Sequence, residues 1–506
     1  MAAYLLGVDA GTTASKALLF DLEGDIVASS SREYPVIYPK PTWAEQDPNV
    51  WWKTVAANIR DVVKGSGVKP DEIAGVAVDS QREAPVPLDK RGEALSNAII
   101  WLDRRTLPQA EKIKEAIPNV EVIEETGVPA DYFYSAAKIL WLKEHRPHTF
   151  KKTSLFLFPK DYLVFKLTGQ RVTDYSMASR TMLFNIHELR WSERLCADLD
   201  IPPDLLPDVK PSTENVGELT PEAAHLVGLR QGTPVAAGGG DRPCEALGAG
   251  VIAPGQVNIG TGTATCLEVP LPSPRVDLQG RFDCCCHVIP GHWEYEVVIL
   301  TTGASLKWFR DTFGYEEVQK GRRNGVDPYA YFDALAKEVP PGCEDLFYYP
   351  YPMGAKAPRF NNLAKGVFYG FTLGHTKSHF IRAILEGIAF QYTETLLLLQ
   401  DFEVRVREAS IVGGESRSAL WNQIKTDVMN KPLRTLKVSD AAALGSAILA
   451  GVASQVFTSV QKAARQMVHA KNLYRPDIGR SAQYRAILQK YDGVYSSLEK
   501  GYILLS

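Results

Sequence analysis

Three short apolar runs open the chain, at residues 4–8, 17–20 and 26–28. Glycine and threonine fill the first intervening turn, Gly11-Thr12-Thr13, and the second turn is Leu22-Glu23-Gly24-Asp25. Runs of this length between turn residues are typical of consecutive β-strands. A helix start is predicted at Asp47-Pro48-Asn49, and a further apolar run at 73–78 leads into the polar stretch 79–83. Strands mixed with helices in this order predict an α/β fold.

The same succession returns in the middle of the chain. Three glycines lead to Asp241, and a strand at 256–259 is followed by the turn Gly260-Thr261-Gly262-Thr263 and another strand. Residues 7–14 and 258–264 echo each other weakly. Because this echo falls where a duplicated fold would restart, we expect two domains, 1–250 and 251–506.

Composition excludes several classes of protein. The 506 residues are 45% hydrophobic and 23% charged, and glycine and proline are dispersed, which excludes disordered, collagen-like and coiled-coil chains. A length of this order suits about two to four domains. The formal charge of −3 and a pI near 6.4 show no basic footprint, so nucleic acid is not an expected partner.

Two further features bear on the compartment. Residues 441–461 carry no charge, but serine, threonine and glutamine interrupt them too often for a lipid-facing helix, so a buried helix and no membrane partner are expected. The first residues lack the basic and apolar regions of a signal peptide. Seven cysteines, three of them adjacent at 284–286, indicate buried thiols rather than a disulfide framework or a metal site with His287. We therefore expect a cytoplasmic protein.

Common catalytic motifs are absent, including the Walker loop, a complete G-x-G-x-x-G, H-E-x-x-H and G-x-S-x-G. Two Gly/Thr turns remain, one at Thr12-Thr13 and one at Gly260–Thr263. One such turn alone is most simply a hairpin. Two of them, opening the two halves of the chain, favour a cradle of backbone N–H groups for a triphosphate. Asp9 would then hold Mg²⁺, largely through water.

Asp241 is the second carboxylate of interest. It follows three glycines and precedes a short predicted helix, so a helix N-cap is the simpler interpretation. The functional interpretation is a general base that accepts the proton of a substrate hydroxyl during phosphoryl transfer. Asp241 is also a candidate ligand for the metal beside Asp9.

Further stretches lie in a fixed order along the chain: 9–16, 133–141, 302–308, 366–371 and 379–386. Together with Asp241, the turn at 260–263 and the pair Gly413-Gly414, they resemble the FGGY family of carbohydrate kinases over nearly the whole length. The resemblance implies two actin/hexokinase-like, ribonuclease H-like lobes around a nucleotide cleft. It also implies an enzyme that transfers the γ-phosphoryl group of ATP, with Mg²⁺, to a hydroxyl group.

The same resemblance implies roles for individual residues. Asp241 takes the place of the catalytic aspartate. The first phosphate hairpin contributes Thr12, Thr13 and Lys16. The remaining nucleotide contacts fall on Gly260, Thr261, Gly262, Thr263, Gly303, Gly413, Gly414 and Ser418. A homodimer is a family expectation only.

The substrate is less clear from the sequence. Arg82-Glu83 and Trp101 resemble glycerol kinase and would bind hydroxyls and pack on a carbon chain, although an adjacent Arg–Glu pair is otherwise a common surface pair. Phe133 and Arg242 depart from the glycerol kinase pattern, and the guanidinium of Arg242 favours a more oxygen-rich or anionic substrate. Residues 101–105 and 351–359 look more like the xylulokinase branch.

We expect glycerol or a closely related polyol as the acceptor, bound by Arg82, Glu83, Trp101, Asp241 and Arg242. A pentulose kinase, acting on xylulose or ribulose, is the alternative within the family. An actin- or chaperone-like ATPase is the alternative from another class, and a catalytically silent relative of the kinases is a further one. A filament or chaperone has no need for the Arg82, Glu83 and Trp101 set.

Overall fold

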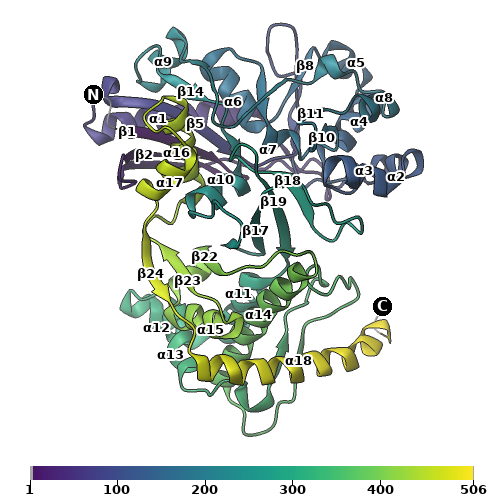
Figure 1. Ribbon diagram of the computed structural model, residues 1–506, viewed down its shortest axis with the longest axis vertical. Coiled ribbons are helices and arrows are strands. Elements are labelled where there is room, and N and C mark those ends of the chain that lie inside the picture. The colour runs from purple at the N-terminus through teal and green to yellow at the C-terminus, as the bar shows by residue number, and fades with distance from the viewer. Residues whose placement is uncertain (1–3, 505–506) are drawn as a thin grey trace. The chain divides into compact units, whose positions relative to one another are not determined.

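A computed structural model describes residues 4–504. The chain divides into two compact units (Figure 1). The first unit consists of residues 1–252 together with two later segments, 270–295 and 440–469. The second unit consists of residues 253–269, 296–439 and 470–506. The chain therefore returns to the first unit twice after leaving it.

A mixed sheet forms the centre of the first unit. Its strands follow the order β13-β14-β5-β1-β2-β3, and β15 pairs with β5 beyond β14. The strands are β1 (Tyr4–Ala10), β2 (Ala14–Asp21), β3 (Ile26–Glu33), β5 (Ile73–Ser80), β13 (Asn215–Glu218), β14 (Pro234–Ala236) and β15 (Gly239–Gly240). β1 runs antiparallel to β2 and parallel to β5, as a strand–turn–strand followed by a crossover requires.

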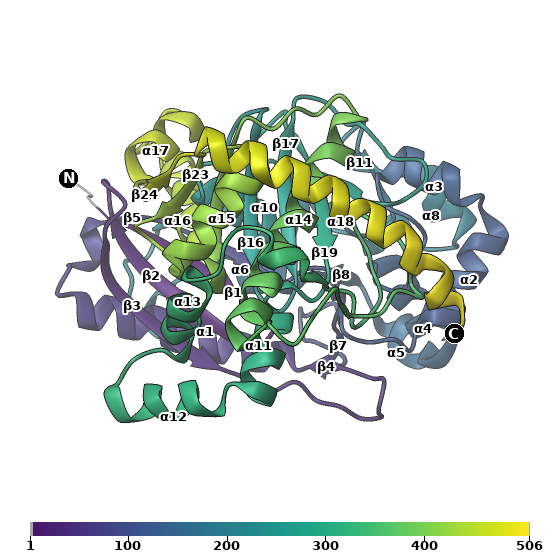
Figure 2. The ribbon, with the colours of Figure 1, turned by 90° about the horizontal axis from the view of Figure 1, so that it is seen from below.

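Alternation along β1 sends side chains to two helices on opposite faces. Leu6 and Val8 join a core cluster with residues of α1 (Pro48–Ser66), and Figure 2 shows α1 beside β1, β2 and β3. Gly7 points the other way, toward α16 (Ala441–Ala453), where a Cβ would lie 1.9 Å from the carbonyl oxygen of Ala443. A glycine is needed there because helix and strand backbones touch.

The rest of the first unit surrounds this sheet. Short strand pairs there are β4 (Glu45–Gln46) with β7 (Ala98–Ile99), β6 (Val86–Leu88) with β8 (Leu155–Leu157), β9 (Val172–Asp174) with β12 (Asp208–Lys210), and β10 (Phe184–Asn185) with β11 (Arg190–Trp191). The helices are α2 (Leu107–Ala116), α3 (Asn119–Thr126), α4 (Ser135–His145), α5 (Pro147–Lys152), α6 (Pro159–Thr168), α7 (Tyr175–Ala178), α8 (Glu193–Asp198), α9 (Pro221–Val227), α10 (Asp241–Gly248) and α17 (Val460–Met467). β18 (Asp283–Cys286) belongs to the first returning segment.

The second unit repeats the strand–turn–strand plan. β16 (Gln256–Thr261) is antiparallel to β17 (Thr265–Leu271) and parallel to β22 (Glu408–Gly413), which is followed by β23 (Leu433–Leu436) and β24 (Ala470–Tyr474). β19 (Trp293–Ile299) belongs to this unit from Glu296 onward, and β20 (Phe347–Tyr349) and β21 (Val367–Tyr369) complete its strands. Its helices are α11 (Thr302–Phe313), α12 (Tyr315–Asn324), α13 (Pro328–Lys337), α14 (Lys377–Gln400), α15 (Ala419–Met429) and α18 (Ile478–Leu504), the long yellow helix of Figures 1 and 2.

The structure confirms the predicted α/β class and both predicted hairpins. The uncharged segment predicted as one buried helix instead forms α16, which is buried, and then turns before α17 begins. Among residues 4–504, no helix combines the length and apolar character needed to cross a bilayer. All seven cysteines are buried as free thiols.

Candidate active site

Two carboxylates lie side by side where β1 and β5 end. The parallel register pairs Asp9 with Asp79, and Asp79 is fully buried. The hydroxyl of Ser446 on α16 donates a hydrogen bond to Oδ2 of Asp79 at 2.7 Å. Burial, followed by the charge of Asp241, raises the pKa of Asp9 to about 6. Burial and the neighbouring Asp9 also raise the pKa of Asp79 well above its ordinary value.

Asp241 is brought to the same edge of the sheet by two glycines. Gly239 and Gly240 form β15, which pairs with Asp79 and Ser80 of β5. Asp241 is then the first residue of α10, and the N-cap is Gly240, so Asp241 does not have the simple capping role. Its side chain is 34% exposed, and its Oδ1 lies 3.4 Å from Nε of Arg82. A partly exposed carboxylate beside a buried guanidinium can receive a proton from a ligand.

Oxygen ligands gathered in this way suit a hard divalent cation. Asp9 and Asp241 repel each other, and a bound cation would relieve the repulsion that raises the pKa of Asp9. Within residues 4–504, no three His, Cys, Asp or Glu side chains are arranged to hold a metal by themselves. Mg²⁺ fits this description, because it usually binds through one or two carboxylates together with water and phosphate oxygens.

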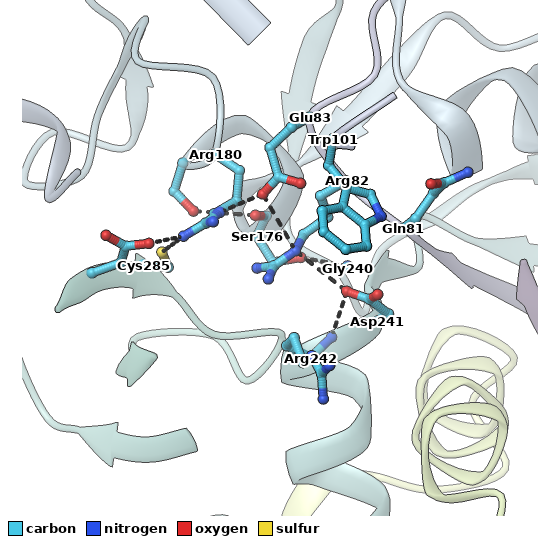
Figure 3. A network of polar contacts seen from close by, with 12 residues as sticks. Gln81, Arg82, Glu83, Trp101, Ser176, Arg180, Gly240, Asp241, Arg242 and Cys285 are labelled. Atoms are coloured by element: carbon cyan, nitrogen blue, oxygen red, sulfur yellow. Dashed lines mark hydrogen bonds and ion pairs between the residues drawn. The ribbon is translucent and has the colours of Figure 1, made fainter. Parts of the chain in front are cut away.

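Acidic and basic side chains alternate within the first unit (Figure 3). We call this series, Asp241–Arg82–Glu83–Arg180–Asp283, the polar line. Arg82 Nε lies 4.0 Å from Oε1 of Glu83, and the same oxygen accepts a hydrogen bond from Arg180 Nε at 2.6 Å. Arg180 Nη1 also donates to Oδ2 of Asp283 at 2.5 Å, and the hydroxyl of Tyr134 donates to that oxygen at 2.9 Å. Each guanidinium is therefore shared between two carboxylates.

Glu83 is held in an unusual backbone conformation. Its φ is +60°, in the left-handed region that residues other than glycine rarely adopt. The ammonium of Lys138 donates to the carbonyl oxygen of Glu83 at 2.5 Å and to that of Phe133 at 2.8 Å. Burial lowers the pKa of Lys138 to about 7. A strained residue fixed by several partners is a frequent sign of a ligand site.

An aromatic side chain closes one side of this polar line. Trp101 is 36% exposed, its ring lies 6.1 Å from the ring of Phe133, and its Nε1 donates to the Thr12 hydroxyl at 2.8 Å. Thr12 Oγ1 in turn donates to Oε1 of Gln81 at 3.2 Å. A half-exposed indole beside paired charges can pack on a short carbon chain while the charged groups bind its hydroxyls.

The other residues predicted near the first hairpin have their own partners. Thr13 is exposed at the turn, and Lys16 Nζ lies 2.5 Å from Oδ1 of Asp440. Arg242 lies one residue after Asp241, and its Nη1 is 3.5 Å from Oε1 of Glu245 on the next turn of α10. The predicted residues Asp9, Thr12, Arg82, Glu83, Trp101 and Asp241 are thus brought together within the first unit.

The second unit gathers the predicted nucleotide residues around the β16–β17 turn. Thr261 Oγ1 donates to the carbonyl oxygen of Val412 at 2.6 Å. A Cβ on Gly303 would lie 2.2 Å from the carbonyl oxygen of Gly262. Gly413 has a φ of +85°, and a Cβ there would lie 2.0 Å from the carbonyl oxygen of Thr261. These glycines allow protein backbones to approach each other closely at this turn. Phosphate binding by the turn remains a prediction.

Two further predicted residues lie just beyond this turn. A Cβ on Gly414 would meet nothing within 4 Å. Ser418 is the N-cap of α15, and its hydroxyl accepts a hydrogen bond from the Trp421 N–H at 3.0 Å. Ser418 thus has a capping role in the fold, and its predicted contact with nucleotide remains a prediction.

Sequence reasoning missed several members of the polar line. Arg180 and Asp283 lie 97 and 103 residues from their partners Glu83 and Arg180. No local sequence pattern distinguishes them. Asp79 had a detectable signal, since it ends a buried apolar strand where a carboxylate is unexpected.

Comparison with known proteins identifies what this chain is similar to. The model of the N-terminal domain of the FGGY family of carbohydrate kinases matches residues 4–248, and that of the C-terminal domain matches residues 257–454. Among curated relatives, a xylulose kinase of Bacillus subtilis (strain 168) is 31% identical over 97% of both chains. A gluconokinase of the same organism is 30% identical over 99% of this chain and 97% of its own.

A glycerol kinase of Caldanaerobacter subterraneus subsp. tengcongensis is 34% identical over 90% of both chains. Among solved structures, xylulose kinase from Rhodospirillum rubrum superposes with a TM-score of 0.90, at 28% identity over 99% of both chains. The fold is therefore that of the actin/hexokinase-like sugar kinases. The three curated relatives are named for three different substrates.

Proposed function

This chain belongs to the FGGY family of carbohydrate kinases, and we propose that its acceptor is glycerol or a closely related small polyol. It is an ATP-dependent phosphotransferase that acts on a sugar or polyol hydroxyl. The observation that carries the choice of acceptor is the continuous polar line Asp241–Arg82–Glu83 beside the half-exposed ring of Trp101.

Charge balance supports an uncharged acceptor. Arg82 lies between Asp241 and Glu83, and Arg180 lies between Glu83 and Asp283, so neither guanidinium is left to balance a ligand carboxylate. An aldonate such as gluconate would bring another negative charge beside these carboxylates. Arg242, which could attract an anion, already lies 3.5 Å from the carboxylate of Glu245. Hydroxyl groups both donate and accept, and therefore suit alternating guanidinium and carboxylate groups.

The features that resembled the pentulose branch have structural roles. Arg105 is buried, donates to Asp103 and Glu45, and stacks on the ring of Trp43 at 3.7 Å. Arg359, in the second unit, pairs with Glu394 and Asp492. These arginines hold the fold, so their resemblance to xylulokinase says little about the acceptor. A pentulose remains the second candidate because the similar curated chains include a xylulose kinase.

The proposed mechanism assigns one step to each group. Arg82 and Glu83 bind the hydroxyls that do not react, and Trp101 packs on the carbons. Asp241 accepts the proton of the terminal hydroxyl while that oxygen bonds to the γ-phosphorus and the bond from this phosphorus to the bridging oxygen of ADP breaks. Thr12, Thr13, Lys16 and the turn at 260–263 are the proposed phosphate contacts. Asp9 and Asp241 would hold Mg²⁺, which neutralises phosphate charge when bound.

A substrate panel tests the proposal. ADP release from ATP is measured with glycerol, erythritol, xylitol, xylulose, ribulose and gluconate, each over a range of concentrations. We expect the highest kcat/KM with glycerol or one of the short polyols, and none with gluconate. If glycerol and the other polyols are inert beside a fast ketose, the pentulose alternative replaces the proposal. ATP hydrolysis that no acceptor stimulates would overturn both.

A further inference from the structure

A buried chain of polar contacts in the first unit ends at Gly240 of β15, directly before Asp241. It starts at Lys160, whose Nζ lies 3.1 Å from Oδ1 of Asp174, and both side chains are fully buried. The other oxygen of Asp174 accepts hydrogen bonds from the hydroxyls of Ser176 at 2.6 Å and Ser212 at 2.7 Å. Ser176 Oγ then accepts a hydrogen bond from the N–H of Gly240 at 2.9 Å (Figure 3).

Asp174 sets the direction in which the hydroxyl of Ser176 points. A carboxylate only accepts, so the single hydroxyl hydrogen of Ser176 is used on Asp174, and a lone pair is left for the N–H of Gly240. Lys160 supports this charge in the interior. Burial works against its charged form, but Asp161 and Asp174 outweigh burial and raise its pKa. Hydrogen bonds to an ionised group are the stronger kind.

Ser176 contacts β15 on one side, and Arg82 packs against it on the other. A Cβ on Gly240 would lie 2.4 Å from Cδ of Arg82, while one on Gly239 would lie 3.2 Å from Oγ of Ser176. Gly240 is the N-cap of α10, and Asp241 is the first residue of this helix. The position of the Gly240 backbone therefore determines where the side chain of Asp241 lies. Ser176 and Arg82 together therefore determine the position of the Asp241 side chain.

We propose that Ser176 is a positioning residue for phosphoryl transfer. With Asp174 behind it, Ser176 holds β15 in place so that the carboxylate of Asp241 meets the acceptor hydroxyl. This inference rests on the proposed role of Asp241 as the base. Loss of the Ser176 hydroxyl leaves the N–H of Gly240 without this acceptor and allows β15 to move. A shift of about 1 Å in a reacting group costs on the order of a hundredfold in rate.

Ser212 provides a matched control. Its hydroxyl donates to the same oxygen of Asp174 and is also buried, whereas the N–H of Gly240 donates to Ser176. S176A and S212A therefore remove comparable bonds to one carboxylate, and a general loss of stability should appear in both. We expect kcat to fall about tenfold to a hundredfold in S176A alone. The KM for ATP should stay within about twofold of wild type in both variants, because the turn at 260–263 is unchanged.

The assay is ADP release with the fastest acceptor of the substrate panel, together with thermal unfolding of each variant. S176C keeps the size of the side chain with a weaker acceptor, so its kcat should lie between those of wild type and S176A. If S176A does not fold, S176C takes its place in the comparison with S212A. The inference is overturned if S176A, or S176C in its place, turns over as fast as S212A. D241N is measured in parallel: full activity there overturns the proposed base itself, whereas an inactive D241N beside an active S176A overturns only the positioning role.

Discussion

At the scale of single residues, the site depends on how burial distributes charge among its carboxylates. Asp79 is fully buried with its pKa raised, and Asp9 beside it has a pKa of about 6. Asp241 is more exposed and lies against Arg82. Of the three, Asp241 is the one that a ligand can reach while a guanidinium stands beside it, which is why we assign the proton transfer to it.

Replacing Asp241 tests this assignment. In D241N the amide oxygen can still accept from the N–H of Arg242, which donates to Asp241 Oδ1 at 2.8 Å, so the start of α10 should be unchanged. The amide cannot accept the substrate proton, and kcat should fall by about 10²–10⁴-fold. The KM for ATP and the melting temperature should change little. D204N, at an exposed aspartate, is the control, and near-normal turnover in D241N would remove Asp241 from its role.

Arg180 gives a second prediction at this scale. Its guanidinium donates to Glu83 through Nε and to Asp283 through Nη1, a geometry that the single ammonium of lysine cannot reproduce. In R180K, Glu83 loses its fixed orientation, and we expect the KM for the acceptor to rise about tenfold while the KM for ATP stays constant. R194K, at an arginine in exposed ion pairs, should leave both constants unchanged. If the KM for the acceptor is unchanged in R180K, Glu83 does not contribute to acceptor binding in the way proposed.

At the scale of elements, features set by neighbouring residues were predictable and features set by distant ones were not. α1 begins at Pro48 as predicted, because Asp47 is the N-cap and its side chain accepts from the N–H of Asn49. The two Gly/Thr hairpins follow from turn residues between apolar runs. The end of α16 was not predicted, because the segment stays uncharged as far as residue 461 while the helix stops at Ala453.

The contact between α10 and α16 gives a prediction at this scale. Gly445 of α16 lies so close to α10 that a Cβ would fall 2.0 Å from the carbonyl oxygen of Cys244. G445A must push the helices apart, and we expect a loss of about 1–3 kcal/mol in the free energy of unfolding. Because α10 carries Asp241, kcat should fall as well.

The matched control is the same substitution in an open helix. Gly493 of α18 is exposed, and a Cβ there would meet nothing within 4 Å. G493A should therefore gain about 0.5–1 kcal/mol from the better helix propensity of alanine, with unchanged activity. Urea unfolding followed by circular dichroism measures both variants. Equal effects of the two substitutions would show that the close approach of α10 and α16 is not a constraint.

At the scale of the whole molecule, the first unit is completed by segments from far along the chain. Residues 270–295 supply Asp283, and residues 440–469 supply Asp440 and Ser446. These partners lie 103 to 424 residues from the side chains they contact. Hydrophobic periodicity and turn residues depend on neighbours in the sequence, so they pointed to Asp9 and Asp241. The family resemblance added Arg82, and neither signal indicated the distant groups that contact these side chains.

Burial of charge also makes the stability of the whole protein depend on pH. The side chain of Glu394 of α14 is 11% exposed, and this partial burial raises its pKa from 4.5 to about 7 despite the nearby Arg359. Between pH 4.5 and 7 the folded protein therefore holds a proton that the unfolded chain has released. By linkage, the contribution of this group to stability is full below pH 4.5 and is lost as the pH rises toward 7, with a slope of up to about 1.4 kcal/mol per pH unit.

E394Q should remove this dependence, because glutamine resembles the neutral acid at every pH. It also takes from Arg359 one of two partners, and Asp492 remains the other, so a constant loss of stability is expected at both ends of the range. We expect the free energy of unfolding of E394Q, relative to wild type, to improve between pH 5 and pH 7.5 in urea titrations. E338Q, at an exposed glutamate of the same unit, should show no such change. A constant difference between E394Q and wild type across this range would mean that Glu394 is ionised throughout, with Arg359 offsetting the cost of its burial.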